Sequence, residues 1–205
     1  MRAFCRFPFL AAAFVVPLLA QQTSLFEYDH SVPFQYQEQL IRRDGSIEVL
    51  SAHFQNPKGG NVPMLVVRPT GKGRFAGIVY QHGGGQSLVT YLSEAEVLAR
   101  AGAISLLLDA PGPGNGSRKP ESEQSAAEFR DSYAEIVICY RRAIDYLQTL
   151  NNVDPARIGF VGHSYGGIMG GALVTVEAAS PKLRLDRRRG TIHPAYRRDA
   201  DRLLE

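Results

Sequence analysis

One serine lies at the centre of a glycine-rich segment, Gly162-His163-Ser164-Tyr165-Gly166-Gly167, which contains the pattern Gly-x-Ser-x-Gly. The two pattern glycines remove the Cβ atoms that would collide where a strand turns sharply into a helix. A serine at the apex of such a turn is strained and exposed, and the start of the helix presents N–H groups to a developing oxyanion. The pattern predicts that Ser164 is a nucleophile; the alternative is a glycine-rich left-handed turn without chemistry.

A second glycine-rich segment, His82-Gly83-Gly84-Gly85, follows the apolar run of residues 75–81. Consecutive glycines let backbone N–H groups approach a substrate carbonyl oxygen closely, as an oxyanion hole requires. Open parallel sheets bind ligands at the carboxyl ends of their strands, which is where these glycines fall. The segment therefore predicts an oxyanion loop rather than a flexible linker. We expect His82 to anchor this loop and His163 to point away from the substrate.

A third run, Gly112-Pro113-Gly114-Asn115-Gly116, superficially resembles a dinucleotide-binding loop. Pro111 and Pro113 remove backbone N–H donors, and no helical pattern opens directly after the run. We interpret it as a substrate-facing loop or a plain turn.

The elements that must position these segments alternate along the chain. Apolar or β-branched runs predict strands, and apolar residues spaced three or four apart predict helices. The predicted strands are residues 47–54, 62–68, 75–81, 103–108 and 157–161, and the predicted helices are residues 90–100, 129–150 and 168–179. Turn formers at residues 56–61 join the first two strands in a hairpin. Short connections indicate an α/β fold, a mostly parallel sheet with helices on both faces.

The composition is that of one globular domain, because 44% of the 205 residues are apolar, 21% are charged and the net charge is +3. These values exclude disordered, collagen-like and multi-pass membrane chains. The charge is uneven, since residues 182–205 hold eight basic and four acidic residues. This basic tail has no aromatic interleaving beyond Tyr196, so we predict no nucleic-acid partner.

The first 20 residues have the pattern of a secretory signal peptide, with an arginine-containing start, an uncharged apolar run and a polar turn after Ala20. The apolar run is shorter than the roughly 20 residues that a spanning helix needs, so we expect no membrane association after cleavage. The mature protein is predicted to be secreted or periplasmic. Cleavage removes Cys5 and leaves Cys139, which lies on the apolar stripe of a helix and is predicted to be a buried hydrophobe.

The order of the elements resembles that of the α/β-hydrolase superfamily. The order is the hairpin, the strand with His-Gly-Gly-Gly, the strand ending in Asp-Ala-Pro-Gly, the long helix and the serine segment. Within this superfamily, residues 45–180 are similar to the dienelactone hydrolase, acetyl xylan esterase and prolyl oligopeptidase-like group. The resemblance implies that Ser164 attacks the carbonyl of a small-molecule ester or peptide-like substrate and forms an acyl-enzyme. It also implies an oxyanion hole from the N–H groups of Tyr165 and of Gly84 or Gly85, with no cofactor or metal.

The family pattern then breaks off, because such hydrolases carry an acid and a histidine on loops after further strands. From Leu183 onward the residues have neither strand nor helix periodicity, so the C-terminal strands are predicted to be missing. The triad acid and histidine are therefore left unassigned. A compressed triad is the alternative, formed by Ser164, His193 and one of the tail acids Asp186, Asp199 or Asp201. Such a triad would need the tail to be held close to Ser164, and the tail sequence has no strand or helix pattern that would hold it there.

Three interpretations follow for a chain organised as a signal peptide (1–20), a partial hydrolase domain (21–181) and a tail (182–205). The first is a secreted serine hydrolase, truncated by a frameshift near codon 182, with little turnover. The second is a short hydrolase that works through His193 or a partner chain, and the third is a non-catalytic binding module. In all three, residues 157–161 become an exposed sheet edge, which predicts self-association.

Overall fold

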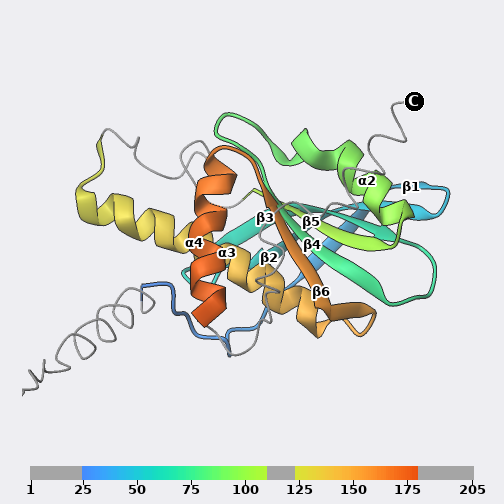
Figure 1. Ribbon diagram of the computed structural model, residues 1–205, viewed down its shortest axis with the longest axis horizontal. Helices are drawn as coiled ribbons and strands as arrows, with labels where there is room; N and C mark the ends of the chain where they lie inside the picture. Colours follow the sequence, from blue (N-terminus) through green and yellow to red (C-terminus); the bar gives the residue numbers. More distant parts are fainter. Residues whose placement is uncertain (1–24, 110–122, 180–205) are drawn as a thin grey trace, which may run out of the picture.

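The computed structural model describes residues 25–109 and 123–179 (Figure 1). The predicted signal peptide, the run Gly112–Gly116 and the tail with His193 lie outside these described residues. The elements are β1 (Gln37–Asp44), β2 (Ile47–Gln55), β3 (Asn61–Pro69), β4 (Phe75–Gln81), the 3-10 helix η1 (Leu88–Tyr91), α2 (Leu92–Arg100), β5 (Ala103–Leu108), α3 (Ala126–Thr149), β6 (Val153–Gly162) and α4 (Tyr165–Ala179).

The strands form one sheet with the order β1-β2-β3-β5-β4-β6. The pairs β1–β2, β2–β3 and β3–β5 are antiparallel, whereas β4 pairs in parallel with both β5 and β6. Strands β2, β5, β4 and β6 therefore run in one direction, and β1 and β3 run in the other. The predicted α/β class with a mostly parallel sheet is confirmed.

The predicted hairpin is confirmed, with Ile47 opposite Pro69 and Gln55 opposite Asn61. Strand β1, in contrast, was not predicted. Its eight residues are all exposed, so the apolar alternation that identifies a half-buried strand is missing. The usable sequence indication was Asp44-Gly45, a dipeptide typical of tight hairpin turns, and Gly45 has a φ of 56°.

Four predicted boundaries are wrong by a few residues, one of them at α3, which begins at Ala126 rather than Phe129. The helix predicted at residues 90–100 is a 3-10 turn, η1, followed by α2 from Leu92. Strand β6 begins at Val153 rather than Arg157, and its register against β4 shifts between Phe75 and Gly77. This irregularity lets an edge strand include Pro155, which has no N–H for a ladder. Helix α4 begins at Tyr165 rather than Ile168.

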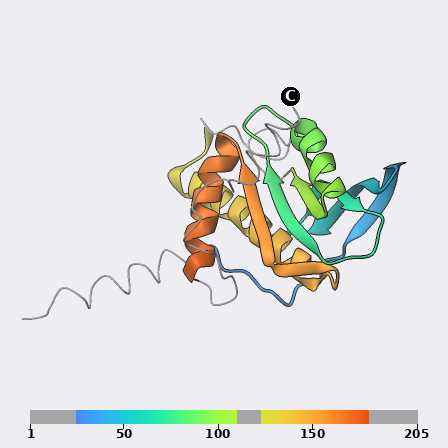
Figure 2. The same cartoon turned by 45° about the vertical axis from the view of Figure 1, so that its right-hand side comes forward.

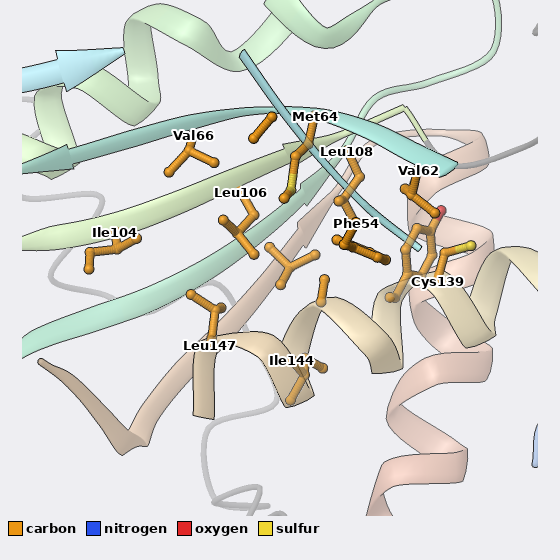
Figure 3. Close-up of a cluster of buried hydrophobic side chains, with 14 of the residues drawn as sticks. Phe54, Val62, Met64, Val66, Ile104, Leu106, Leu108, Cys139, Ile144 and Leu147 are labelled. Carbon is orange, nitrogen blue, oxygen red and sulfur yellow. The ribbon is translucent and has the colours of Figure 1, made fainter. Parts of the chain in front are cut away.

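Helices cover both faces of the sheet, as predicted. On one face, α3 packs on the alternating inward residues of β2, β3 and β5, and Figure 3 shows Leu106 and Leu108 opposite Ile144, Leu147 and Cys139. Helix α4 packs on the same side against α3, β4 and β6. On the other face, Ala95 and Ala99 of α2 pack on the intervening residues of β3 and β5. All six residues of β5 are buried for this reason. Cys139 is buried within the core, which confirms that prediction.

Strand β6 lies at the edge of the sheet, at the end opposite β1 (Figure 2). Most of its residues are exposed or half-buried, although the sequence pattern is apolar on both faces. Beside it, an apolar groove of about 460 Å³ runs between β6 and α4, lined among others by Ile158, Phe160 and Val174. The predicted exposed edge is thus present among the described residues.

Two buried arginines of α3 hold neighbouring segments together. Arg141 Nε donates a hydrogen bond of 2.6 Å to Glu177 Oε1 of α4, and Arg141 Nη1 donates one of 2.6 Å to the carbonyl oxygen of Phe26. The Arg142 guanidinium donates to the carbonyl of Val32 and lies 3.8 Å from the centroid of the Phe34 ring. These contacts fix α4 and residues 25–36 on α3, because each hydrogen bond offsets part of the cost of burying a guanidinium.

Candidate active site

Ser164 lies in the turn between Gly162, the last residue of β6, and Tyr165, the first residue of α4. Figure 1 shows the chain passing from β6 into α4. The φ of Ser164 is 51°, in the left-handed region that side chains rarely adopt, and its side chain is exposed. Such strain at a polar residue is typical of functional sites, where the surrounding structure enforces it.

The two pattern glycines enforce this conformation through close backbone contacts. A Cβ atom on Gly162 would lie 2.4 Å from the carbonyl oxygen of Gly166. A Cβ atom on Gly166 would lie 2.4 Å from the carbonyl oxygen of Gln81, the last residue of β4. The amide of Gly166 also donates to the carbonyl of His163 at 3.0 Å, which closes the turn. Only glycine fits both positions, which is the steric reason the sequence pattern suggested.

The residue after the serine begins the helix. Tyr165 is the first residue of α4, and the first turn of a helix carries the positive end of its dipole. Its ring is half-buried and meets the Tyr133 ring edge-on at a centroid distance of 5.7 Å. Beneath it, burial raises the pKa of Tyr140 well above the ordinary value, so this phenol stays neutral under the turn. The Tyr165 side chain therefore belongs to the core, while its backbone lies beside Ser164.

The loop after β4 lies against this turn. A Cβ atom on Gly83 would lie 3.3 Å from His163 Nδ1 and 3.4 Å from the His163 carbonyl oxygen. Gly84 and Gly85 are both exposed, and Gly85 has a φ of 72°. The structure thus brings the two glycine-rich segments together, with the exposed His163 side chain beside Gly83.

His82 anchors the loop through both ring nitrogens. Nδ1 lies 2.8 Å from the carbonyl oxygen of Gly83, and Nε2 lies 3.2 Å from Oδ1 of Asp109, which directly follows β5. Both partners are hydrogen-bond acceptors, so each ring nitrogen faces an acceptor oxygen. These contacts support the predicted anchoring role. Sequence reasoning assigned no role to Asp109 or to Gln86. The Gln86 side chain accepts a hydrogen bond from the Gly83 amide. Asp109 was recognisable only as a polar residue at the end of a strand.

The described part of the chain does not complete a catalytic triad. The Ser164 hydroxyl makes no hydrogen bond to any residue in the ranges 25–109 and 123–179. His193 and the acids Asp186, Asp199 and Asp201 lie outside those ranges. Within them, no group of three or more histidine, cysteine or acidic residues is placed to bind a metal ion, and no helix is long and apolar enough to cross a membrane.

Solved structures share this arrangement of elements. The acetyl xylan esterase from Paenibacillus sp. R4 is similar with a TM-score of 0.61 and 20% identity, over 79% of this chain and 55% of that one. Acetyl xylan esterase 1 from Thermoanaerobacterium sp. JW/SL YS485 is similar with a TM-score of 0.62 and 16% identity, over 81% of this chain and 56% of that one. The chain thus spans about half the length of these esterases.

A search of curated proteins by sequence found no match. The family model described as the alpha/beta hydrolase fold matches residues 78–181, which is half of the chain and runs from β4 through the end of α4. The matched residues include the glycine-rich loop after β4, the serine turn and the strands that bring them together. The chain belongs to the alpha/beta hydrolase fold family.

Proposed function

We propose that this protein is a serine hydrolase that cleaves carboxylic esters through an acyl-enzyme, with Ser164 as the nucleophile. The observation that carries the proposal is the strained, exposed Ser164 at a φ of 51° between two glycines that admit no side chain. The esterase function of the structural neighbours supports the choice of an ester substrate. The signal-like residues 1–20 support action in the periplasm or outside the cell.

In the proposed reaction, Ser164 Oγ attacks the ester carbonyl carbon, and the hydroxyl proton passes to a general base, a role that no residue in the ranges 25–109 and 123–179 is placed to fill. The carbonyl oxygen becomes an oxyanion, which accepts hydrogen bonds from the backbone N–H groups of Tyr165 and of Gly84 or Gly85. Collapse of the tetrahedral intermediate releases the alcohol and leaves an acyl group on Ser164, and water then hydrolyses it. Loss of one oxyanion donor typically lowers kcat by about 10² to 10³, so the loop is expected to contribute strongly to the rate.

A second candidate is a secreted binding module that keeps the hydrolase pocket without the chemistry. The specific observation in its favour is the Ser164 hydroxyl, which has no hydrogen-bonded base among the described residues. An unactivated serine is a poor nucleophile near neutral pH. The intact oxyanion loop and strained turn favour the hydrolase, because a pure binder has no need of them.

Reaction with a fluorophosphonate, followed by peptide mass spectrometry, tests the nucleophile directly. We expect the adduct on Ser164, and we expect p-nitrophenyl acetate hydrolysis to fall to the buffer rate in Ser164→Ala. Ser51→Ala is the matched control, because Ser51 is an exposed serine on β2 far along the sheet from the turn. The binding module would be favoured by two results together: no fluorophosphonate adduct on Ser164, and a ligand that raises Tm by the same amount in the unchanged protein and in Ser164→Ala.

A further inference from the structure

The three glycines of the oxyanion loop are not equivalent. The backbone N–H of Gly83 donates a hydrogen bond of 2.7 Å to Oε1 of the Gln86 side chain. The carbonyl oxygen of Gly83 accepts a bond of 3.2 Å from the Gln86 amide and faces His82 Nδ1 at 2.8 Å. The N–H groups of Gly84 and Gly85, in contrast, donate to no residue within the described ranges. Of the three glycine amides in this loop, these two remain available to a substrate oxygen.

Consecutive glycines need an external constraint to hold a shape, because glycine has the largest backbone freedom of all residues. Gly83 is the buried end of the loop and contacts His163 of the serine turn. Gln86 bonds both polar backbone groups of Gly83, one through its side chain and one through its amide. The result is a closed four-residue turn, and the φ of 72° at Gly85 suits the third position of such a turn.

We propose that Gln86 is a positioning residue of the oxyanion loop. Its side chain occupies the Gly83 amide and thereby fixes the turn in which Gly84 and Gly85 present their N–H groups to the carbonyl oxygen of the substrate. Gln86 itself touches neither the substrate nor Ser164. This inference rests on the proposed function and adds the residue that keeps its oxyanion donors in place.

The contact and its consequence are measured separately in Gln86→Ala. Amide hydrogen exchange followed by NMR is expected to accelerate at Gly83 roughly fivefold, the value of one net hydrogen bond. The rate of Ser164 labelling by a fluorophosphonate is expected to fall about tenfold, less than the loss from removing an oxyanion donor outright. The fall should appear in the limiting rate, with the half-saturating probe concentration unchanged and Tm lowered by no more than roughly 2 to 4 °C, the shift that one net hydrogen bond gives in a domain of this size.

Two further variants separate positioning from general damage. Gln86→Glu keeps an acceptor oxygen at the same reach and is expected to restore both Gly83 protection and most of the labelling rate. Gln39→Ala, an exposed glutamine on β1 at the far end of the sheet, is expected to change neither.

Equal labelling rates for Gln86→Ala and the unchanged protein would overturn the positioning role while leaving the serine hydrolase intact. An unchanged protein that is not labelled at Ser164 would overturn the proposed function, and this inference with it. Faster Gly83 exchange in Gln86→Glu as well as in Gln86→Ala would show that the acceptor oxygen is not what holds the loop.

Discussion

Gly166→Ala is expected to destabilise the protein and to disturb the nucleophile together. The added Cβ would lie 2.4 Å from the carbonyl oxygen of Gln81 and 3.0 Å from its carbonyl carbon. An ordinary contact begins near 3.4 Å, so the start of α4 and the end of β4 must separate by about 1 Å. No side-chain rotation relieves this clash, because both partners are backbone.

The size of the effect follows from what must move. Overpacking of this kind costs typically about 1 to 3 kcal/mol in the free energy of unfolding. For a domain of this size, about 2 kcal/mol corresponds to a fall in Tm of roughly 4 to 8 °C. Because Gly166 also shapes the turn that holds Ser164, labelling of Ser164 by a fluorophosphonate is expected to slow as well.

Urea unfolding followed by circular dichroism measures the stability, and Gly171→Ala on the same helix is the matched control. A Cβ on Gly171 has no atom within 4 Å, so alanine there meets open space. Alanine is favoured over glycine inside a helix by about 1 kcal/mol, so the control is expected to be more stable than the unchanged protein. The free energy of unfolding is therefore expected to fall in Gly166→Ala and to rise in Gly171→Ala. A Gly166→Ala protein with unchanged stability and an unchanged labelling rate would refute the close approach of α4 to β4.

Two further predictions concern the helices and the sheet edge. Arg141→Met leaves the Glu177 carboxylate buried without its 2.6 Å partner, so the free energy of unfolding measured by urea titration is expected to fall by about 3 to 5 kcal/mol. The double variant Arg141→Met with Glu177→Leu is expected to recover most of this loss. A double variant as unstable as Arg141→Met would contradict the ion-pair argument. Val174→Lys places a charge in the apolar groove beside the β6 edge and is expected to reduce concentration-dependent association measured by sedimentation velocity. The control Val97→Lys changes a similarly exposed valine on α2 and is expected to leave association unchanged. Equal effects of the two substitutions would contradict association through this edge.

The periodicity of the chain was sufficient for most of the fold. Continuous apolar runs predicted β4 and β5, because strands buried on both faces of the sheet need apolar residues at successive positions. Apolar residues at helical spacing predicted α3, because a helix that packs on the sheet along one side needs apolar residues every three or four positions. Strand β1 escaped because none of its residues is buried, so its formation depends on pairing with β2 rather than on an apolar pattern. Local patterns also misplaced the start of β6, whose irregular register is a property of its pairing with β4.

For the candidate site, the sequence by itself determined the residue types that the turn tolerates: Gly162 and Gly166 flank a serine because any Cβ would meet backbone. It also determined that His82 and the following glycines fall at the end of a buried strand. Only the tertiary structure decided which atoms meet there, namely the carbonyl of Gln81 against Gly166, Asp109 against His82, and Gln86 on the Gly83 amide. The physical reason is that the sharp turn brings Gly162 against Gly166 within a few residues and so leaves a local pattern. The contact of Gly166 with Gln81 and the hydrogen-bond partners are set by strand order and loop closure, which a linear pattern does not encode.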